Sequence, residues 1–294
     1  MEPILNSNEL KIWQTMPEIK KRHIFKIVYS MLARVAKRQL DYVSQWKLVF
    51  NDEKQSAHVY VFETVENFWK NVGLAQYLGK GNYANFAHYP VRVCMEMFLQ
   101  FFYFCKQPMG TRNHIAILEL LRPSVRYYMR ATKAGGNTIH YKEFYDRYSK
   151  ELNLPQDIDN VKERDIRRSL TPFPPMKKLC ENYHSNDPDG ATILYFLYQY
   201  LCESVHGKTF AQFLRKQAVD FPDYRRGMMI LYIFCKDILV LLDKNYLGNR
   251  FRTDVEGVVS EADNFIKNSV NRYNQNPMVY ILRRKLRLCI NKNK

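Results

Sequence analysis

The sequence has little cysteine, and its six cysteines lack the spacings of a metal or redox site. No C-x-x-C pair, no H-E-x-x-H and no Walker-type glycine loop occurs, which excludes the commonest zinc and nucleotide sites. Most of the cysteines stand in apolar stretches, where a thiol behaves as a small hydrophobe. We therefore expect reduced thiols, a cytoplasmic location, and neither a metal nor a cofactor.

Long apolar runs are also missing. The longest, residues 227–242, is shorter than the roughly 20 residues of a membrane-spanning helix, and it contains Lys236 and Asp237. The first residues, MEPILNSNELKIW, lack the basic segment and unbroken apolar run of a secretory signal. We expect a soluble protein with no transmembrane segment.

Acidic residues are outnumbered. Forty-five Lys and Arg stand against 29 Asp and Glu, a formal net charge of +16. Such an excess favours a partner that carries phosphate, or an anionic surface, over an acidic small molecule. Nucleic acid is one partner of this kind.

The two-residue alternation of half-buried strands is hard to find, whereas apolar residues recur at helical spacing along most of the chain. We therefore predict an all-α helical bundle, and the 46% hydrophobic content supports a substantial core. The predicted helices cover residues 16–50, 55–78, 88–107, 111–133, 191–206, 224–247, 254–274 and 278–290. We expect the fourth to bend or restart at Pro123.

The character of the chain changes between residues 135 and 188. This segment is charged, rich in tyrosine and interrupted by prolines, among them Pro155 and Pro172. We interpret it as an insert of short surface helices within a single all-helical domain, residues 1–294.

The predicted helix 191–206 is apolar or aromatic around most of its circumference. Its larger polar residues, Gln199, Glu203 and His206, stand at i, i+4 and i+7 and so share one face. A helix that is otherwise apolar all round is typical of a bundle centre, where a polar stripe cannot simply face water.

The predicted helix 88–107 repeats this arrangement with Arg92, Glu96 and Gln100 at i, i+4 and i+8. Because burying an unpaired charge costs several kcal/mol or more, we expect the two stripes to face each other. Their charged residues then satisfy one another or line a wet cleft.

The polar residues of these two helices also resemble a known family. The pairing of R-x-x-x-E, from Arg92 to Glu96, with a helix end Y-x-x-x-S-x-H-G that closes at Gly207 resembles the HEPN-type bundles of bacterial toxins and abortive-infection proteins. The similarity spans about residues 60–245 without the insert. It implies an all-helical, often dimeric protein, so a homodimer is expected. In some branches it implies a metal-independent ribonuclease.

Ribonucleases of that kind carry their Arg and His on one helix, four to six residues apart, and no histidine of this chain has an arginine at that spacing. An active enzyme would need Arg92, from another helix, to bind the scissile phosphate and stabilise its charge. His206 would act as general acid or base, oriented by Glu203 or Glu96. The alternative is that these four residues form a buried network that only fixes the helix register.

A metal site is a third interpretation. Glu203 to His206 and Glu181 to His184 are both Glu-x-x-His, the pairing of di-iron carboxylate bundles. Those bundles place the motifs on separate long helices, whereas His184 runs straight into the turn SNDPDG. The sequence favours a site without metal.

Basic faces are further candidates for nucleic-acid binding, because arginines contact phosphates and neighbouring tyrosines stack on bases. Each of these basic faces could equally be a solvated helix face without a partner. The C-terminal helix could also lie on an anionic membrane surface. The candidates are Arg122, Arg126 and Arg130, beside Tyr127 and Tyr128; Arg283, Arg284, Lys285 and Arg287; and Lys20, Lys21, Arg22 and Lys26.

The function expected from the sequence and this resemblance is that of a HEPN-like protein associated with nucleic acid, RNA more than DNA. One form of this function is a metal-independent ribonuclease that acts as a toxin or defence effector. The alternative is a non-catalytic helical module for binding or assembly.

Overall fold

The computed structural model describes residues 4–45, 56–79, 87–134, 142–143, 146, 149–150, 171–205 and 222–275. The regular structure in these ranges is helical, without strands, which confirms the all-α prediction. The helices are α1 (Ser7–Thr15), α2 (Glu18–Ser44), α3 (Ser56–Leu78), α4 (His88–Lys106), α5 (Met109–Lys133), α8 (Met176–Tyr183), α9 (Pro188–Val205), α11 (Pro222–Tyr246) and α12 (Arg252–Gln275).

Most of these helices begin and end within a few residues of the predicted bounds. Helix α5 is continuous, with Pro123 inside it, so the restart considered at that residue does not occur. The predicted helix 278–290 and most of the segment 135–170 lie outside the described residues.

Helix α1 was not predicted from the apolar pattern, although its start is encoded locally. The Asn6 side chain accepts hydrogen bonds from the backbone N–H groups of Asn8 and Glu9 at 3.0 and 2.9 Å. In return, the Glu9 carboxylate accepts from the Asn6 N–H at 2.9 Å. This capping box satisfies N–H groups that the first helical turn leaves without partners.

Contacts divide the chain into two compact units built from alternating segments. The first comprises residues 1–39, 76–85 and 220–294, and the second comprises residues 40–75 and 86–219. The sequence-based prediction of a single domain stays a prediction.

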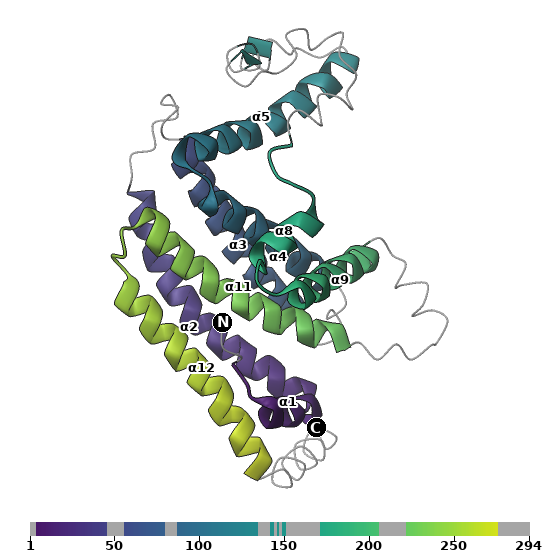
Figure 1. The fold of residues 1–294 in the computed structure, drawn as a ribbon, viewed down its shortest axis with the longest axis vertical. Coiled ribbons are helices and arrows are strands. Elements are labelled where there is room, and N and C mark those ends of the chain that lie inside the picture. Colours follow the sequence, from purple (N-terminus) through teal and green to yellow (C-terminus); the bar gives the residue numbers. More distant parts are fainter. Residues whose placement is uncertain are drawn as a thin grey trace, which may run out of the picture. The chain divides into compact units, whose positions relative to one another are not determined.

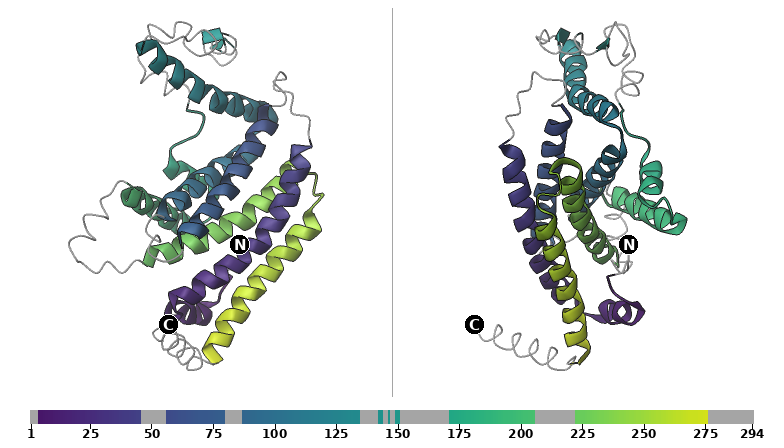
Figure 2. Two further views of the ribbon diagram at one scale, coloured as in Figure 1. Left: turned by 180° about the vertical axis from the view of Figure 1, so that it is seen from behind. Right: turned by 60° about the vertical axis from the view of Figure 1, so that its left-hand side comes forward.

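In the first unit, α2 runs parallel to α11 and antiparallel to α12 (Figures 1 and 2). The Tyr29 hydroxyl donates to the Met228 carbonyl at 2.7 Å, and the Gln39 amide donates to the Leu239 carbonyl at 3.1 Å. Both bonds are buried, and they lie ten residues apart on α2 and eleven residues apart on α11. They fix the register of α2 against α11 through polar groups that burial would otherwise leave unsatisfied.

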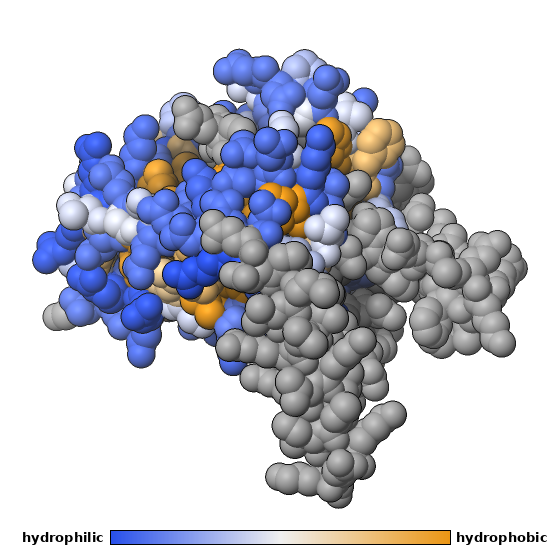
Figure 3. Space-filling model, turned by 90° about the horizontal axis from the view of Figure 1, so that it is seen from below, coloured by the Kyte–Doolittle hydropathy of each residue, from blue (hydrophilic) through white to orange (hydrophobic). Residues whose placement is uncertain are grey.

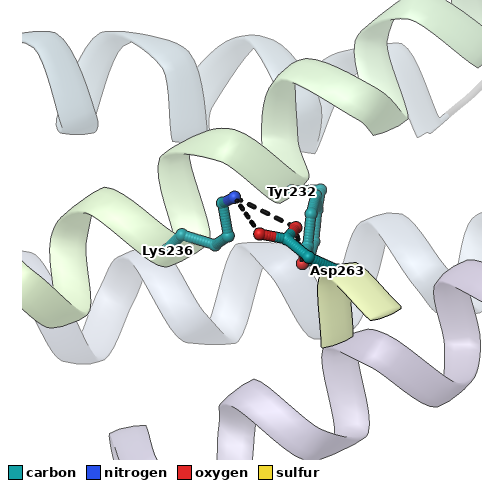
Figure 4. A network of polar contacts seen from close by, with 3 residues as sticks. All are labelled: Tyr232, Lys236 and Asp263. Atoms are coloured by element: carbon teal, nitrogen blue, oxygen red, sulfur yellow. Dashed lines mark hydrogen bonds and ion pairs between the residues drawn. The ribbon is translucent and has the colours of Figure 1, made fainter. Parts of the chain in front are cut away.

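A polar network joins α11 to α12 (Figure 4). The Lys236 ammonium contacts both Asp263 carboxylate oxygens at 3.1 and 3.0 Å, and the Tyr232 hydroxyl donates to Asp263 Oδ1 at 2.8 Å. Burial raises the pKa of Tyr232, and the Asp263 charge raises it further, so the phenol stays protonated and remains a donor.

In the second unit, α3 packs antiparallel to α4. The Tyr60 and Phe104 rings lie 4.6 Å apart, and the Cys94 thiol contacts the Phe68 carbonyl at 3.6 Å. Burial raises the pKa of Cys94 well above its usual value, so this thiol stays protonated and serves as a small core side chain.

Helix α8 ends the segment predicted as a surface insert, yet it contributes to the core of the second unit. Leu179 and Cys180 are buried, and the Tyr183 ring meets Phe98 and Phe102 edge-on at 5.2 and 5.1 Å. This part of the predicted insert is therefore integrated with α4 and α9.

The surface agrees with the charged composition. In its described part, the face drawn in Figure 3 is mostly hydrophilic, and hydrophobic side chains show in small patches between polar ones. None of the helices in the described part of the chain combines the length and apolar character that a membrane crossing requires.

Candidate functional site

The polar stripe predicted on α4 exists, and its charges pair within the helix. The Arg92 Nε and Nη2 atoms both lie 3.0 Å from Glu96 Oε1. The four-residue spacing places the two side chains one above the other on the same face. They are only partly covered, with 22% and 27% of their side-chain surfaces exposed.

Helix α9 adds a third member to this cluster. The Tyr198 hydroxyl donates to the same Glu96 oxygen at 2.7 Å, and the Arg92 guanidinium carbon lies 5.8 Å from the Tyr198 ring centroid. One carboxylate oxygen thus receives donors from two helices. We call Arg92, Glu96 and Tyr198 the α4–α9 cluster.

The pKa values of Arg92 and Tyr198 in this cluster are both raised above their usual values. Burial disfavours the charge on Arg92, but the attraction of Glu96 and its hydrogen bond outweigh this effect and raise the pKa of the guanidinium. Burial raises the pKa of Tyr198, and the hydrogen bond to Glu96 raises it further. Arg92 is therefore a permanent cation, and Tyr198 is a neutral donor.

His88 extends the same face one turn toward the start of α4. Its side chain is buried, and its ring meets the Tyr200 ring edge-on at a centroid distance of 5.9 Å. Desolvation lowers the pKa of His88, which favours the neutral imidazole at pH 7. His88 was not among the residues predicted from the sequence, although it stands four residues before Arg92 and so continues the polar stripe.

The prediction that α9 is surrounded by protein was wrong. Its Ile193 and Phe196 side chains are 64% and 63% exposed, and Gln199 is exposed as well. Leu194 and Leu201, on another face, are buried. Because folded proteins leave much apolar surface in contact with water, an apolar circumference alone did not locate this helix.

This orientation also changes which residue meets α4. The contact to Glu96 comes from Tyr198 and not from its neighbour Gln199, which is about 100° further around the helix. Glu203 lies in the last turn of α9, but its side chain is not among those described, and His206 lies beyond the described residues. The meeting of Arg92 with His206 stays a prediction.

The predicted basic faces are only partly covered by the described side chains. Arg122 is paired with Glu119 at 2.8 Å, so its charge is already compensated. Arg126 and Arg130 lie on α5 as predicted, but their side chains are outside the described set. The residues Arg283, Arg284, Lys285 and Arg287 also lie outside it.

The cluster predicted near the start of α2 is smaller than expected. Lys21 is buried, and its ammonium lies 3.3 Å from the Gln14 carbonyl and 5.6 Å from the Trp13 ring centroid. The Lys20 ammonium lies 4.8 Å from the Tyr273 ring centroid. Lys26 is the one member of this cluster that is exposed.

The residues considered for a metal site have other partners where they are described. Glu181 pairs with Lys178 at 2.7 Å, and the His184 Nδ1 atom lies 3.6 Å from Asp187. Among the described side chains, no group of three or more His, Cys, Asp and Glu is placed to hold a metal ion.

The α4–α9 cluster can therefore supply a fixed guanidinium cation, a carboxylate and a phenol, with a neutral imidazole one turn away. No protein-family model, no curated protein and no solved structure matches this chain.

Proposed function

We propose that this chain is a cytoplasmic, HEPN-like helical protein that binds RNA, and that its α4–α9 cluster braces the fold without catalysing a reaction. The observation that carries the proposal is the charge excess of +16, because nucleic-acid affinity rests mainly on cations that neutralise phosphates. A cationic surface of this kind attracts polyanions, and the HEPN-like resemblance favours RNA among them.

The bracing role follows from how the cluster is occupied. Arg92 would bind a phosphate most strongly if its guanidinium were uncompensated, but Glu96 takes two of its N–H donors. Glu96 is in turn shared with Tyr198 of another helix. Such mutual satisfaction is typical of a network that fixes how two helices pack.

RNA binding can be measured by fluorescence anisotropy with a labelled single strand over a range of salt concentrations. We expect the affinity to fall steeply with salt, since each neutralised phosphate releases counterions. The variant Arg92→Met should lower the melting temperature and leave the affinity unchanged. Affinity that ignores salt would contradict RNA binding, and loss of affinity in a folded Arg92→Met protein would contradict the bracing role.

A second candidate is a metal-independent ribonuclease, acting as a toxin or defence effector and assembled as a homodimer. One observation favours it: the side chains of Arg92 and Glu96 are partly exposed, so a phosphate could reach the guanidinium. His206 would then move the proton while Arg92 binds the scissile phosphate.

The two candidates are separated by incubating the purified protein with RNA in the presence of a chelator. The ribonuclease predicts cleavage that disappears in both His206→Ala and Arg92→Lys. Tyr195→Phe, which keeps a ring on the neighbouring turn of α9, serves as the matched control and should cleave normally. Cleavage that survives His206→Ala would assign the activity elsewhere, and light scattering would test the dimer.

A further inference from the structure

Helix α2 carries a large excess of positive charge for its length. Its sequence contains seven Lys and Arg and two acidic residues, Glu18 and Asp41, an excess of five. The helix is amphipathic, and its apolar face, with Val28 and Leu32 fully buried, packs in the first unit. The opposite face is exposed and mostly polar, with Ile19 and Ala33 as its exposed apolar residues.

Some basic residues of α2 are buried or ion-paired, and others are not. Lys21 is buried, and Arg38 pairs with Asp254 at 3.0 Å. Lys26, Arg34 and Lys37 are exposed, and no described carboxylate forms an ion pair with any of them. We call these three residues the α2 basic stripe.

The geometry of the stripe suits an extended polyanion. At 1.5 Å of rise per residue, Lys26 and Lys37 are about 16 Å apart along the helix axis, and Arg34 stands between them. At 100° per residue, the three side chains project within about 80° of one another. At about 3.4 Å per nucleotide, a stripe of this length covers roughly five phosphates of one strand.

The residues between the cations also favour nucleic acid over a lipid surface. Ser30 and Ala33, which are exposed within the stripe, are small and add no bulk that would keep a backbone away. A helix that lies on a membrane inserts a broad apolar face, whereas the apolar face of α2 is buried in the protein. Ile19, before the stripe, is the one large apolar residue of α2 that is strongly exposed.

We propose that the α2 basic stripe is a binding surface for the phosphate backbone of single-stranded RNA. The contact is made by Lys26, Arg34 and Lys37, and it reads charge and spacing without reading base sequence. This inference rests on the proposed RNA binding and assigns it to a specific surface.

The test compares two triple variants that remove the same charge from the full-length protein. One is Lys26→Gln/Arg34→Gln/Lys37→Gln, and the matched control neutralises the exposed Lys11, Lys244 and Lys267 of the same unit in the same way. Both sets lie on the surface, and circular dichroism checks that each variant folds. Anisotropy with a labelled ten-nucleotide strand then gives the affinity at several salt concentrations.

We expect the stripe variant to bind at least about tenfold more weakly at 0.1 M salt, and its salt slope to be smaller by about two, which is three contacts at roughly 0.7 each. The control should keep a slope close to that of the unmodified protein. Equal losses in both variants would overturn the inference and leave diffuse RNA binding in place.

A wild-type protein that binds no RNA would overturn the proposed function itself, so the two failures can be distinguished. Anionic vesicles of phosphatidylserine and phosphatidylcholine provide the other arm. If the stripe variant loses vesicle binding and keeps RNA binding, the surface belongs to a membrane, and the inference is wrong.

Discussion

Glu96 gathers donors from two helices on a single oxygen. Arg92 approaches from one turn earlier on α4, and Tyr198 approaches from α9. Hydrogen bonds to a charged group contribute more than neutral ones, yet the pair is partly exposed, so solvent screens part of the gain. We therefore expect the cluster to fix how α4 packs against α9 while adding little to the free energy of unfolding.

Removing the Tyr198 hydroxyl tests this contact. We expect Tyr198→Phe to lower the free energy of unfolding by about 1 kcal/mol, because it deletes a hydrogen bond to a carboxylate and keeps the ring that lies beside Arg92. Urea denaturation measures the change. Tyr195→Phe, one turn earlier on α9, is the control and should alter stability much less. Equal effects of both variants would show that the hydroxyl of Tyr198 has no special role.

His88 gives a pH dependence whose sign follows from its burial. Desolvation lowers the pKa of the folded protein's His88 below its usual value of 6.5. As the pH falls through 6.5, the unfolded chain takes up a proton that the folded protein resists, so stability decreases toward acid. Denaturation midpoints between pH 7.5 and 5 should show this slope, and His88→Gln should reduce it.

His184 provides the comparison. Burial also lowers the pKa of His184, but the nearby Asp187 charge acts in the opposite direction. His184→Gln should therefore remove a smaller part of the slope than His88→Gln. A slope that persists unchanged in His88→Gln would contradict the assignment of acid sensitivity to this buried imidazole.

Helix α9 begins with a turn in which a side chain replaces missing backbone partners. The Asp187 Oδ1 atom accepts a hydrogen bond from the Gly190 N–H at 2.9 Å, as an N-cap residue does. A Cβ at Gly190 would collide with the Asp187 carboxylate and would lie 2.9 Å from His184 Nδ1. A Cβ here would force the capping Asp187 carboxylate to move, so the demand on this position comes from close approach and not from backbone conformation.

Gly190→Ala should therefore destabilise the protein by about 1 to 2 kcal/mol, comparable to the loss of a helix cap. Gly257 of α12 is a control with the opposite expected sign. A Cβ there meets nothing within 4 Å, so Gly257→Ala should stabilise by roughly 0.5 to 1 kcal/mol through helix propensity. Thermal unfolding of both variants tests the pair, and shifts in the same direction would contradict the steric argument.

The pairing of α11 with α12 depends on charges that lie largely out of water. The Lys236 side chain is 9% exposed and that of Asp263 is 26% exposed. We expect Lys236→Met to cost about 2 kcal/mol, less than a fully buried pair would, because solvent reaches the carboxylate left behind. The double variant Lys236→Met/Asp263→Leu should recover part of the loss. Additive effects in this cycle, measured by urea denaturation, would show that the two side chains do not interact.

The net charge of +16 acts on the whole molecule as well as on its partners. Like charges on one folded chain repel each other, which destabilises the folded state. Salt screens this repulsion over about 10 Å at 0.1 M. We therefore expect the melting temperature to rise when sodium chloride is increased from 20 to 200 mM, followed by circular dichroism. A falling melting temperature would mean that surface ion pairs outweigh the repulsion.

Much of the helical architecture could be predicted from local patterns. The apolar spacing predicted α4 and α12 nearly to their ends, and the four-residue step from Arg92 to Glu96 predicted that they share a face. The start of α1 could have been found from the capping box of Asn6 and Glu9. These features depend on residues within a few positions of each other.

The contacts between helices could not be predicted in the same way. Tyr198 reaches Glu96 across 102 residues of sequence, and Gln199, which the stripe pattern favoured, is exposed. The rotation of α9 about its axis depends on which of its apolar faces packs best against α4 and α8. Because α9 has apolar residues on nearly every side, the periodicity of its sequence did not indicate which face packs inward.

The amino-acid sequence by itself determined the helical class, most helix bounds, the charge excess and the Arg92–Glu96 pair, because each depends on composition or on spacing within one helix. Only the tertiary structure decided that Tyr198 completes the cluster, that Lys21 is buried while Lys26, Arg34 and Lys37 stay exposed, and that Asp263 meets Lys236. These outcomes depend on packing between distant segments, where several faces compete and small differences in burial and pairing select one.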